Sequence, residues 1–429
     1  MLTLSCLTPA SSLFVLVPGL LATQGTGAVM TLLTAVVLCV AVAFCYSELG
    51  TLAPSSGGEY AMVGTVAGRL TGWLVFVVSL LVVLVVPPVM ALGTAEYLAP
   101  VWTVDSKFLG ALVMVLSVCM GLLHLRTNAW VTGAFMVLEI GAAAVVAILG
   151  FTHRHQQPGV LFHPQVVHDN MIQPFTVGLL ISGLAMALFV LQGFSSAVYL
   201  AEEMRDPRRT VARTVLWTLA VGALVLIVPT VAITLGAPDL SSLADGDLMG
   251  MIAEWSSSPF ATVIGACVAL AIVNASIVMV IQNSRILFAS ARDRAWPVPV
   301  NRAFGRINAR GAPWVATLVV GIPGAALCFA DLTLLNQVTS VVIASLYLIV
   351  AVGALGGRRA RHRDVLAWRM PLWPAVPCLV IIALVYVLTQ QPVVALLVPA
   401  GVLCAATLYW ALYLRPRPLD RWVITIPDE

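Results

Sequence analysis

The chain has 429 residues, of which 60% are hydrophobic and only 10% are charged, and its formal net charge at pH 7 is +3. A soluble protein carries about 25% charged residues, so this composition excludes a soluble globular domain, a disordered chain and a disulfide scaffold, and the low charge argues against nucleic-acid binding. The mean hydropathy of +1.01 and repeated apolar runs of about 20 residues predict a polytopic helical protein embedded in a lipid bilayer.

Twelve apolar segments along the chain are predicted to be transmembrane spans. Each must be essentially helical, because backbone groups in lipid have no water to bond. The eight cysteines lie in or beside these segments without a CxxC pair, so we interpret them as small buried hydrophobes and expect no metal or cofactor. The predicted spans are 3–21, 27–46, 70–98, 108–124, 130–150, 175–201, 214–236, 259–284, 314–330, 334–355, 371–389 and 393–414.

The basic residues predict the orientation of these spans. If the N-terminus is cytoplasmic, all of the 22 lysines and arginines except Lys107 and Arg154 fall in loops or ends on the cytoplasmic side. The loop between spans 7 and 8 falls outside and carries acids but no basic residue. Because basic residues are retained on the inner side, we expect a multi-pass protein of the cytoplasmic membrane with both termini in the cytoplasm.

Two predicted spans, five apart, contain matching interruptions. Span 1 has a proline beside small and hydroxyl residues, and span 6 has a glycine within a polar cluster near its middle. Matched weak points in the two halves of a chain point to an inverted-repeat transporter with a binding site at the membrane midplane; ordinary helix packing is the alternative. The predicted substrate-binding residues are Thr8, Ala10, Ser11, Ser12, Gln192, Gly193, Phe194 and Ser195.

An acidic residue, Glu139, lies near the middle of predicted span 5. An ionised carboxylate at that depth is costly, so such a residue is functional by default; a protonated glutamate bonded to a neighbouring helix is the alternative. We predict that Glu139 binds and releases the proton that drives transport. Other polar residues within the spans, including Asn274, Ser276 and Gln282, are expected mainly to hold helices together.

Four segments carry a family resemblance. Residues 47–60, with Ser55-Ser56-Gly57-Gly58-Glu59-Tyr60, resemble the loop after span 2 of amino acid–polyamine–organocation (APC) permeases. The segments GFSSAVYLAEEMRDPRRTVART (193–214), NSRILFASARDRAWP (283–297) and GAPWVATL (311–318) are similar to span 6 with its following loop, the end of span 8 and the start of span 9 of the same superfamily.

This resemblance implies an all-α LeuT-type fold with twelve transmembrane helices. Two inverted five-helix repeats, about 1–150 and 175–355, would form a transport core over 1–355, followed by two further helices at 371–414 and a tail at 415–429. It implies a secondary transporter of amino acids, proton-coupled or exchange-driven, with a permease or antiporter of organic amines or polyamines as the alternative. A channel and a membrane enzyme are disfavoured, since no selectivity-filter motif and no catalytic cluster is found.

Three positions depart from the pattern that the resemblance implies. Ala10-Ser11-Ser12 stands where relatives often have a Gly-Ser-Gly break, and Ser195 stands where relatives that take cationic amino acids often have an acid. Glu139 stands at a position that resembles that of a span-5 lysine in many relatives. The missing acid favours a neutral substrate, whereas a carboxylate at position 139 could carry a proton or attract a cation.

Overall fold

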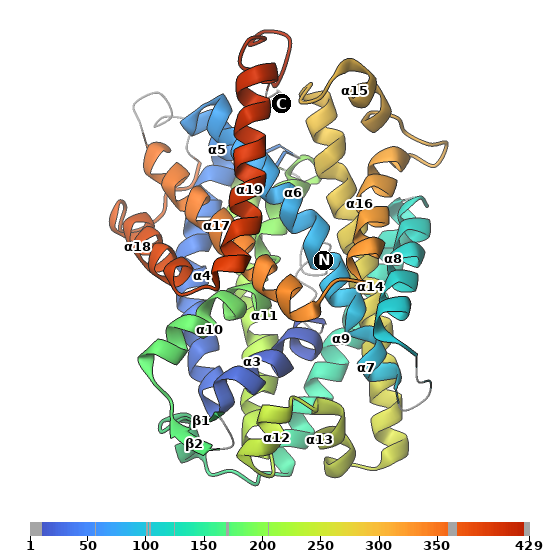
Figure 1. Cartoon of the computed structure of the whole chain (residues 1–429), viewed down its shortest axis with the longest axis vertical. Coiled ribbons are helices and arrows are strands. Elements are labelled where there is room, and N and C mark those ends of the chain that lie inside the picture. Colours follow the sequence, from blue (N-terminus) through green and yellow to red (C-terminus); the bar gives the residue numbers. More distant parts are fainter. Residues whose placement is uncertain are drawn as a thin grey trace.

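The computed structural model describes residues 11–55, 57–99, 102, 104–123, 125–168, 171–204, 206–358 and 367–423, and the side chains of all of these except 125–132, 168, 200, 202 and 203. The described chain is a bundle of helices, many of which run along the long axis of the molecule (Figure 1). Eight described stretches are apolar and long enough to cross a membrane, at 12–52, 69–98, 133–152, 177–199, 207–236, 258–292, 332–356 and 393–414. Shorter apolar helices occupy 106–121, 314–327 and 375–389.

Each of the predicted spans coincides with helical structure, and span 1 does so from residue 11 onward. The first part of the bundle consists of η1 (Ser12–Leu16), α3 (Val17–Gln24), η2 (Gly25–Gly27), α4 (Ala28–Leu52), α5 (Glu59–Ala67), α6 (Arg69–Leu92), α7 (Thr94–Leu98), α8 (Ser106–Gly121) and α9 (Leu125–Thr152). The glycine-rich stretch after α4 therefore separates it from the short α5, as the breaker residues there predict.

The second part of the bundle begins after a long connection that contains η3 (Pro158–Leu161), β1 (Gln165–His168) and β2 (Met171–Pro174). Its helices are α10 (Val177–Val190), η4 (Phe194–Glu203), α11 (Pro207–Gly236), α12 (Leu240–Asp245), α13 (Leu248–Trp255), α14 (Ser258–Arg292), α15 (Val298–Phe304), α16 (Trp314–Leu327), α17 (Leu332–Gly356), α18 (Ala375–Thr389), α19 (Val393–Tyr409) and η5 (Trp410–Leu414).

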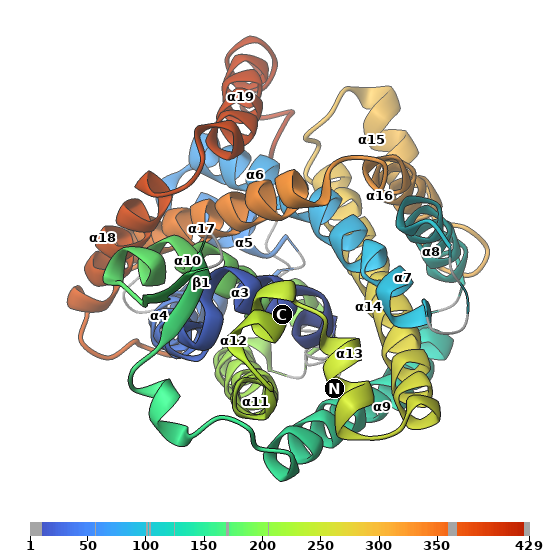
Figure 2. The same cartoon turned by 60° about the horizontal axis from the view of Figure 1, so that its bottom comes forward.

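The strands β1 and β2 were not expected in an all-helical protein. They form an antiparallel hairpin in which Gln165 pairs with Pro174 and His168 with Met171. The hairpin is anchored to the turn between α3 and α4, because the Thr26 hydroxyl accepts a hydrogen bond from the Gln165 amide at 2.9 Å. The hairpin, α12 and α13 lie at one end of the bundle (Figures 1 and 2), which we call the hairpin end.

Several helices begin at an aspartate that caps their free amides. Asp105 accepts from the amides of Lys107 and Phe108 at the start of α8, and Asp331 accepts from the Leu334 amide at 2.8 Å at the start of α17. Asp239 and Asp247 cap α12 and α13 in the same way. A carboxylate at a helix N-terminus satisfies donors that have no partner within the helix. These four aspartates therefore lie at helix N-termini, where their carboxylates bind backbone amides.

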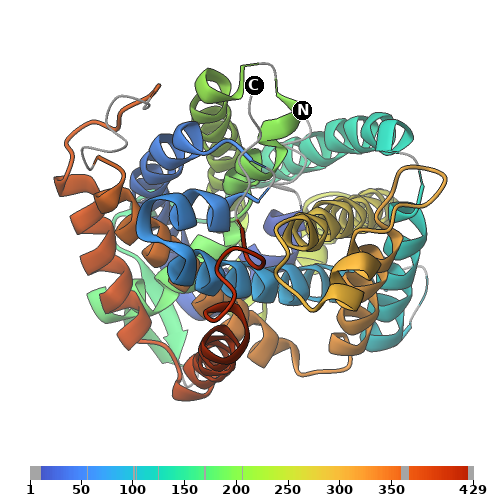
Figure 3. The ribbon, with the colours of Figure 1, turned by 90° about the horizontal axis from the view of Figure 1, so that it is seen from above.

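The helices pack around a small number of central contacts. α11 packs against α4 and α9, while α8 packs against both α14 and α16. α17 contacts α4, α6 and α10, and α18 and α19 pack at its outer side. α5 and α15 lie at the end of the molecule opposite the hairpin (Figures 1 and 3), which we call the α5/α15 end. The candidate site described next lies among α5, α6, η4, α14 and α17.

Candidate functional site

The predicted interruption of span 6 is present in the structure. The α-helix α10 ends at Val190, and the chain continues after a turn as the 3-10 helix η4. Gly193 in this turn has a φ of +120°, a conformation that residues with a side chain rarely adopt. Because a helix end leaves carbonyl groups without intrahelical partners, the interruption places polar backbone atoms inside the apolar bundle.

A small cavity adjoins this interruption. Its volume is about 30 Å³, which is room for about two water molecules. Five elements line it: α5, α6, the 192–199 segment, α14 and α17. The lining residues are Glu59, Ser79, Val82, Val83, Gln192, Ser195, Tyr199, Gln282, Asn283, Ile286, Ile343, Leu346 and Tyr347. The structure therefore brings the predicted residues Gln192 and Ser195 to one polar cavity.

Phe194, one of the predicted substrate-binding residues, is fully buried beside the cavity, within a cluster of aromatic rings. Its ring centroid lies 6.0 Å from that of Tyr46 on α4 and 5.6 Å from that of Tyr347 on α17. Tyr46 and Tyr347 are themselves 6.0 Å apart, edge to face. Since edge-to-face pairs are favourable at this spacing, Phe194 joins span 6 to spans 2 and 10. It does not line the cavity itself.

The predicted residues of span 1 are less completely placed. Thr8 and Ala10 lie outside the described residues. Ser11 and Ser12 are buried, and the Ser11 hydroxyl has no hydrogen-bond partner within the described part of the chain. The π-helix η1 that contains Ser12 runs directly into α3 and contacts α10, so spans 1 and 6 are neighbours. Neither serine lines the cavity.

Two prolines leave backbone carbonyl groups without their usual helical donors. Side chains from other helices donate hydrogen bonds to these carbonyls instead. Pro87 in α6 cannot donate to the Val83 carbonyl one turn earlier, and Asn283 of α14 donates its side-chain amide to that oxygen at 2.9 Å. Pro18 likewise leaves the Phe14 carbonyl free, and the Tyr97 hydroxyl donates to it at 2.6 Å. These bonds attach interrupted helices to their neighbours on either side of the site.

Glu59 is a cavity residue that was quoted in the sequence resemblance but not predicted as part of the site. It is the first residue of α5, is 1% exposed, and accepts a hydrogen bond from the Tyr46 hydroxyl at 3.2 Å. α5 belongs to no candidate span. Burial raises the pKa of the Glu59 carboxyl to about 8, although the Glu59 backbone amide and the nearby hydroxyls of Tyr46 and Ser195 act to lower the pKa.

Glu139 lies apart from this cavity, on the face of α9 that packs against α14. Its side chain is 1% exposed, and its Oε1 accepts a hydrogen bond from the Asn274 side-chain amide at 3.4 Å. Asn274 therefore joins two helices, and Ser276 bonds to the Ile272 carbonyl within its own helix. Gln282, which we expected to serve helix packing, instead lines the cavity.

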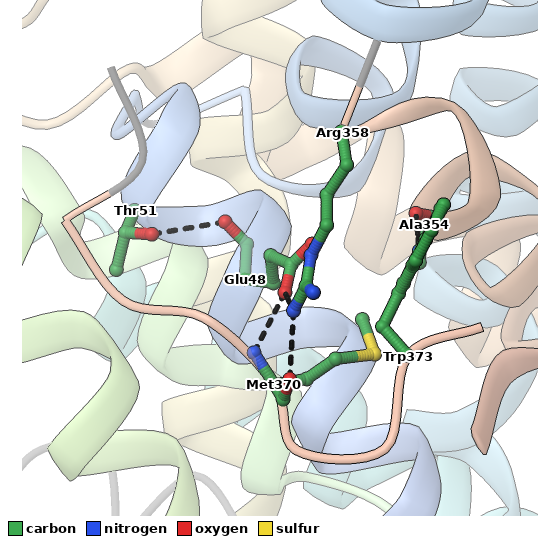
Figure 4. A network of polar contacts seen from close by, with 6 residues as sticks. All are labelled: Glu48, Thr51, Ala354, Arg358, Met370 and Trp373. Carbon is green, nitrogen blue, oxygen red and sulfur yellow. Dashed lines mark hydrogen bonds and ion pairs between the residues drawn. The ribbon is translucent and has the colours of Figure 1, made fainter. Parts of the chain in front are cut away.

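A second polar cluster lies near the α5/α15 end and ties α4 to α17 (Figure 4). Arg358 donates two hydrogen bonds to the Glu48 carboxylate, at 2.9 and 2.8 Å, and a third to the Met370 carbonyl. The Met370 amide donates to the same carboxylate at 2.7 Å, and Arg358 stacks on Trp373. Glu48 is thus satisfied within the protein. Within the described residues no three His, Cys, Asp or Glu side chains are placed to hold a metal ion.

Long apolar helices that surround a polar internal cavity, with one helix interrupted beside it, are features of secondary transporters. The chain belongs to the amino acid permease family, whose profile matches residues 2–414, and it is therefore a multi-pass membrane transporter of the APC superfamily.

Proteins similar to this chain are transporters rather than enzymes. The chain is 25% identical over 405 residues to the branched-chain amino acid permease BcaP of Lactococcus lactis, covering 88% of this chain and 85% of the relative. It is 25% identical over 298 residues to the large neutral amino acids transporter small subunit 2 of Oryctolagus cuniculus, covering 67% of this chain and 55% of that protein. An uncharacterized transporter of Mycobacterium tuberculosis is 25% identical over 310 residues, covering 71% and 66%.

Proposed function

We propose that this protein transports neutral amino acids with apolar side chains by alternating access. The observation that carries the proposal is the cavity at the span 6 interruption. Hydroxyl and amide groups from Ser195, Gln192 and Gln282 share it with aliphatic side chains such as Val82 and Leu346. Free backbone groups at a helix break can bind the charged ends of an amino acid, while the aliphatic wall suits an apolar side chain.

The relatives support a neutral substrate, since the names of two of them refer to branched-chain and large neutral amino acids. A volume of about 30 Å³ is too small for an amino acid, so binding requires the cavity to expand. We therefore assign this conformation to a closed stage of the transport cycle. An organic amine is the second candidate substrate, and the observation that favours it is the carboxyl of Glu59 in the cavity wall.

Uptake into proteoliposomes tests this proposal. We expect uptake of labelled leucine, isoleucine, valine and phenylalanine, and none of putrescine or spermidine. Ser195→Trp fills the cavity and should abolish uptake, whereas Ser182→Trp, on an exposed position of α10, should leave it intact. Uptake of the amines alone would replace the first candidate by the second. Normal leucine affinity in the Ser195→Trp protein would contradict the placement of the site.

We also propose an arrangement of the membrane spans and roles for the span 1 residues and Phe194. We propose twelve membrane spans in two inverted repeats plus two helices, with the α5/α15 end and both termini in the cytoplasm. Thr8, Ala10, Ser11 and Ser12 would complete the substrate site from span 1 once the cavity opens. Phe194 would close over the substrate, because its ring already joins span 6 to Tyr46 and Tyr347.

We also propose Glu139 as the residue that couples transport to the proton gradient. Its burial between α9 and α14 supports this role, because a carboxyl there is stable when protonated and needs water or a cation when ionised. Glu139→Gln keeps the shape of the side chain but cannot release a proton. We expect this variant to exchange leucine across the membrane and to lose accumulation driven by a pH gradient. Accumulation equal to that of the parent would remove Glu139 from the coupling mechanism.

A further inference from the structure

Glu59 is a buried acid to which the proposed transport mechanism assigns no task. Its Oε1 accepts one hydrogen bond from Tyr46, while its Oε2 has no hydrogen bond of normal geometry within the described residues. The carboxyl group nevertheless lines the cavity beside Ser195. An unpartnered oxygen of a side chain that is only 1% exposed costs free energy, unless the group carries a proton or water reaches it.

The surroundings of Glu59 contain no fixed positive charge among the described residues that line the cavity. The titratable groups that face it are tyrosines, one each from α4, η4 and α17, and α6 and α14 contribute only a serine and two amides. These groups are Tyr46, Tyr199, Tyr347, Ser79, Gln282 and Asn283. The nearby Asp293 instead accepts a hydrogen bond from Tyr60 at 2.9 Å. An ionised Glu59 would therefore have only neutral neighbours among the described residues that line the closed cavity.

We propose that Glu59 is a proton-binding site and that loss of its proton opens the cavity toward the α5/α15 end. The inference rests on the proposed transport function, since it concerns the opening step of that cycle. Tyr46 links the acid to the gate, because its hydroxyl bonds Glu59 and its ring packs against both Phe194 and Tyr347. A change at Glu59 thus reaches spans 2, 6 and 10 through one side chain.

The sign of the effect follows from burial. Burial raises the pKa of Glu59 to about 8 in the closed cavity, whereas water in an open cavity would return it toward its ordinary value. The closed state therefore binds the proton more tightly, and by linkage protonation stabilises the closed state. This stabilisation is fully present below the ordinary carboxyl pKa and is lost as the pH rises through about 8. Alkaline pH at the α5/α15 side should favour opening.

Cysteine labelling measures this opening without a substrate. Val82 lines the cavity and is 9% exposed, so Val82→Cys, in a background without native cysteines, reports access of a membrane-impermeant maleimide. The reagent is added to inside-out and right-side-out vesicles, and the rate is divided by that of the exposed Ile307→Cys at the same pH. We expect the ratio at the α5/α15 side to rise at least about tenfold between about pH 6 and about pH 9.

Variants at Glu59 decide the assignment. Glu59→Gln should make the labelling ratio independent of pH, and Glu59→Asp should keep the dependence. Asp245→Asn, at an exposed position of α12 at the hairpin end, should behave as the parent. Tyr46→Phe removes a hydrogen bond that lowers the pKa of Glu59, so it should move the midpoint of the pH-dependent labelling ratio to higher pH. This variant is the second test if Glu59→Gln does not fold. An unchanged pH dependence in folded Glu59→Gln, or an unchanged midpoint in Tyr46→Phe, would overturn the proposal.

Leucine uptake by the same preparations separates this inference from the proposed function. Uptake by the parent together with a pH-independent labelling ratio would overturn the role of Glu59 and leave transport intact. A labelling ratio that depends on Glu59, in a protein that takes up no amino acid, would support the proton site and overturn the proposed substrate.

Discussion

At the scale of single residues, the site is built by side chains that replace missing backbone hydrogen bonds. Asn283 donates to the Val83 carbonyl, which Pro87 leaves without its helical partner, at 2.9 Å. Both Val83 and Asn283 line the cavity. A buried carbonyl without a donor costs about 1–3 kcal/mol. The Asn283 side-chain amide therefore replaces the backbone hydrogen bond that α6 lacks, and the same bond attaches α14 to α6.

We predict that Asn283→Leu lowers the free energy of unfolding by about 1–3 kcal/mol, because the Val83 carbonyl then has no donor. Pro87→Ala restores a backbone amide that can donate to this carbonyl, so the loss in the double variant should be less than half as large. Thermal unfolding in detergent measures both. An equal loss in the two backgrounds would show that the bond to Val83 does not account for the effect.

At the scale of elements, the interruption of span 6 depends on one glycine. Gly193 has a φ of +120°, and a side chain at this position would strain the turn between α10 and η4 by about 1–3 kcal/mol. The strain would favour a continuous helix, in which Gln192 and Ser195 would no longer be presented to the cavity together.

We therefore expect Gly193→Ala to reduce both thermal stability and leucine uptake. Gly141 offers a matched control, since it lies within α9 with no atom within 4 Å of an added Cβ. Gly141→Ala should preserve uptake and raise stability by about 0.5–1 kcal/mol, as alanine favours a helix interior. A Gly193→Ala protein with the uptake and stability of the parent would show that the interruption does not need glycine.

The contact between α4 and α17 depends on a buried ion pair. Glu48 is fully buried and Arg358 is 21% exposed, with 2.8 Å between Arg358 Nη2 and Glu48 Oε2. Removing one member of such a pair leaves a buried charge and costs about 3–5 kcal/mol, whereas removing both costs less. The pair also holds the 370–373 segment through Met370 and Trp373 (Figure 4).

We predict that Arg358→Met destabilises the protein by about 3 kcal/mol and that Glu48→Gln combined with it recovers part of the loss. Arg209→Met is the surface control: Arg209 and Asp206 are 3.6 Å apart, with 83% and 55% of their side chains exposed. Such exposed pairs contribute little, so this change should be silent. Thermal unfolding in detergent compares Arg358→Met, the double variant and Arg209→Met. A double variant no more stable than Arg358→Met would show that the buried charge of Glu48 does not cause the loss of stability.

At the scale of the whole molecule, the two ends of the bundle differ in charge. The hairpin end carries the acids of 239–254, and most basic residues belong to loops or helix ends near α5 and α15. This distribution predicts which end faces the cytoplasm, and the proposed direction of opening at Glu59 depends on it.

Labelling of intact cells tests the orientation. In a background without native cysteines, Asp245→Cys on α12 should react with an impermeant maleimide added outside. Ile307→Cys, which is 55% exposed after α15, should react only after the cells are permeabilised. The reverse pattern would invert the topology, and the cavity would then open outward at its α5/α15 side.

The sequence alone predicted the helices and the break in span 6. Apolar runs the length of a bilayer leave the backbone no other way to satisfy its hydrogen bonds, and Gly193 within a polar cluster marks a local weakness. The hairpin at 165–174 was missed, because it is held by a distant contact with Thr26 rather than by its own short strands.

Only the tertiary structure decided which polar residues share a cavity. Glu59, Asn283 and Tyr347 are far apart in the chain, and no spacing in the sequence relates them. Helix packing brings Glu59 to the wall of the cavity with Ser195, and it places Glu139 against Asn274 instead. Local sequence determines where a helix forms or breaks, because those energies arise between near neighbours. The partners of a buried carboxyl are set by packing between helices.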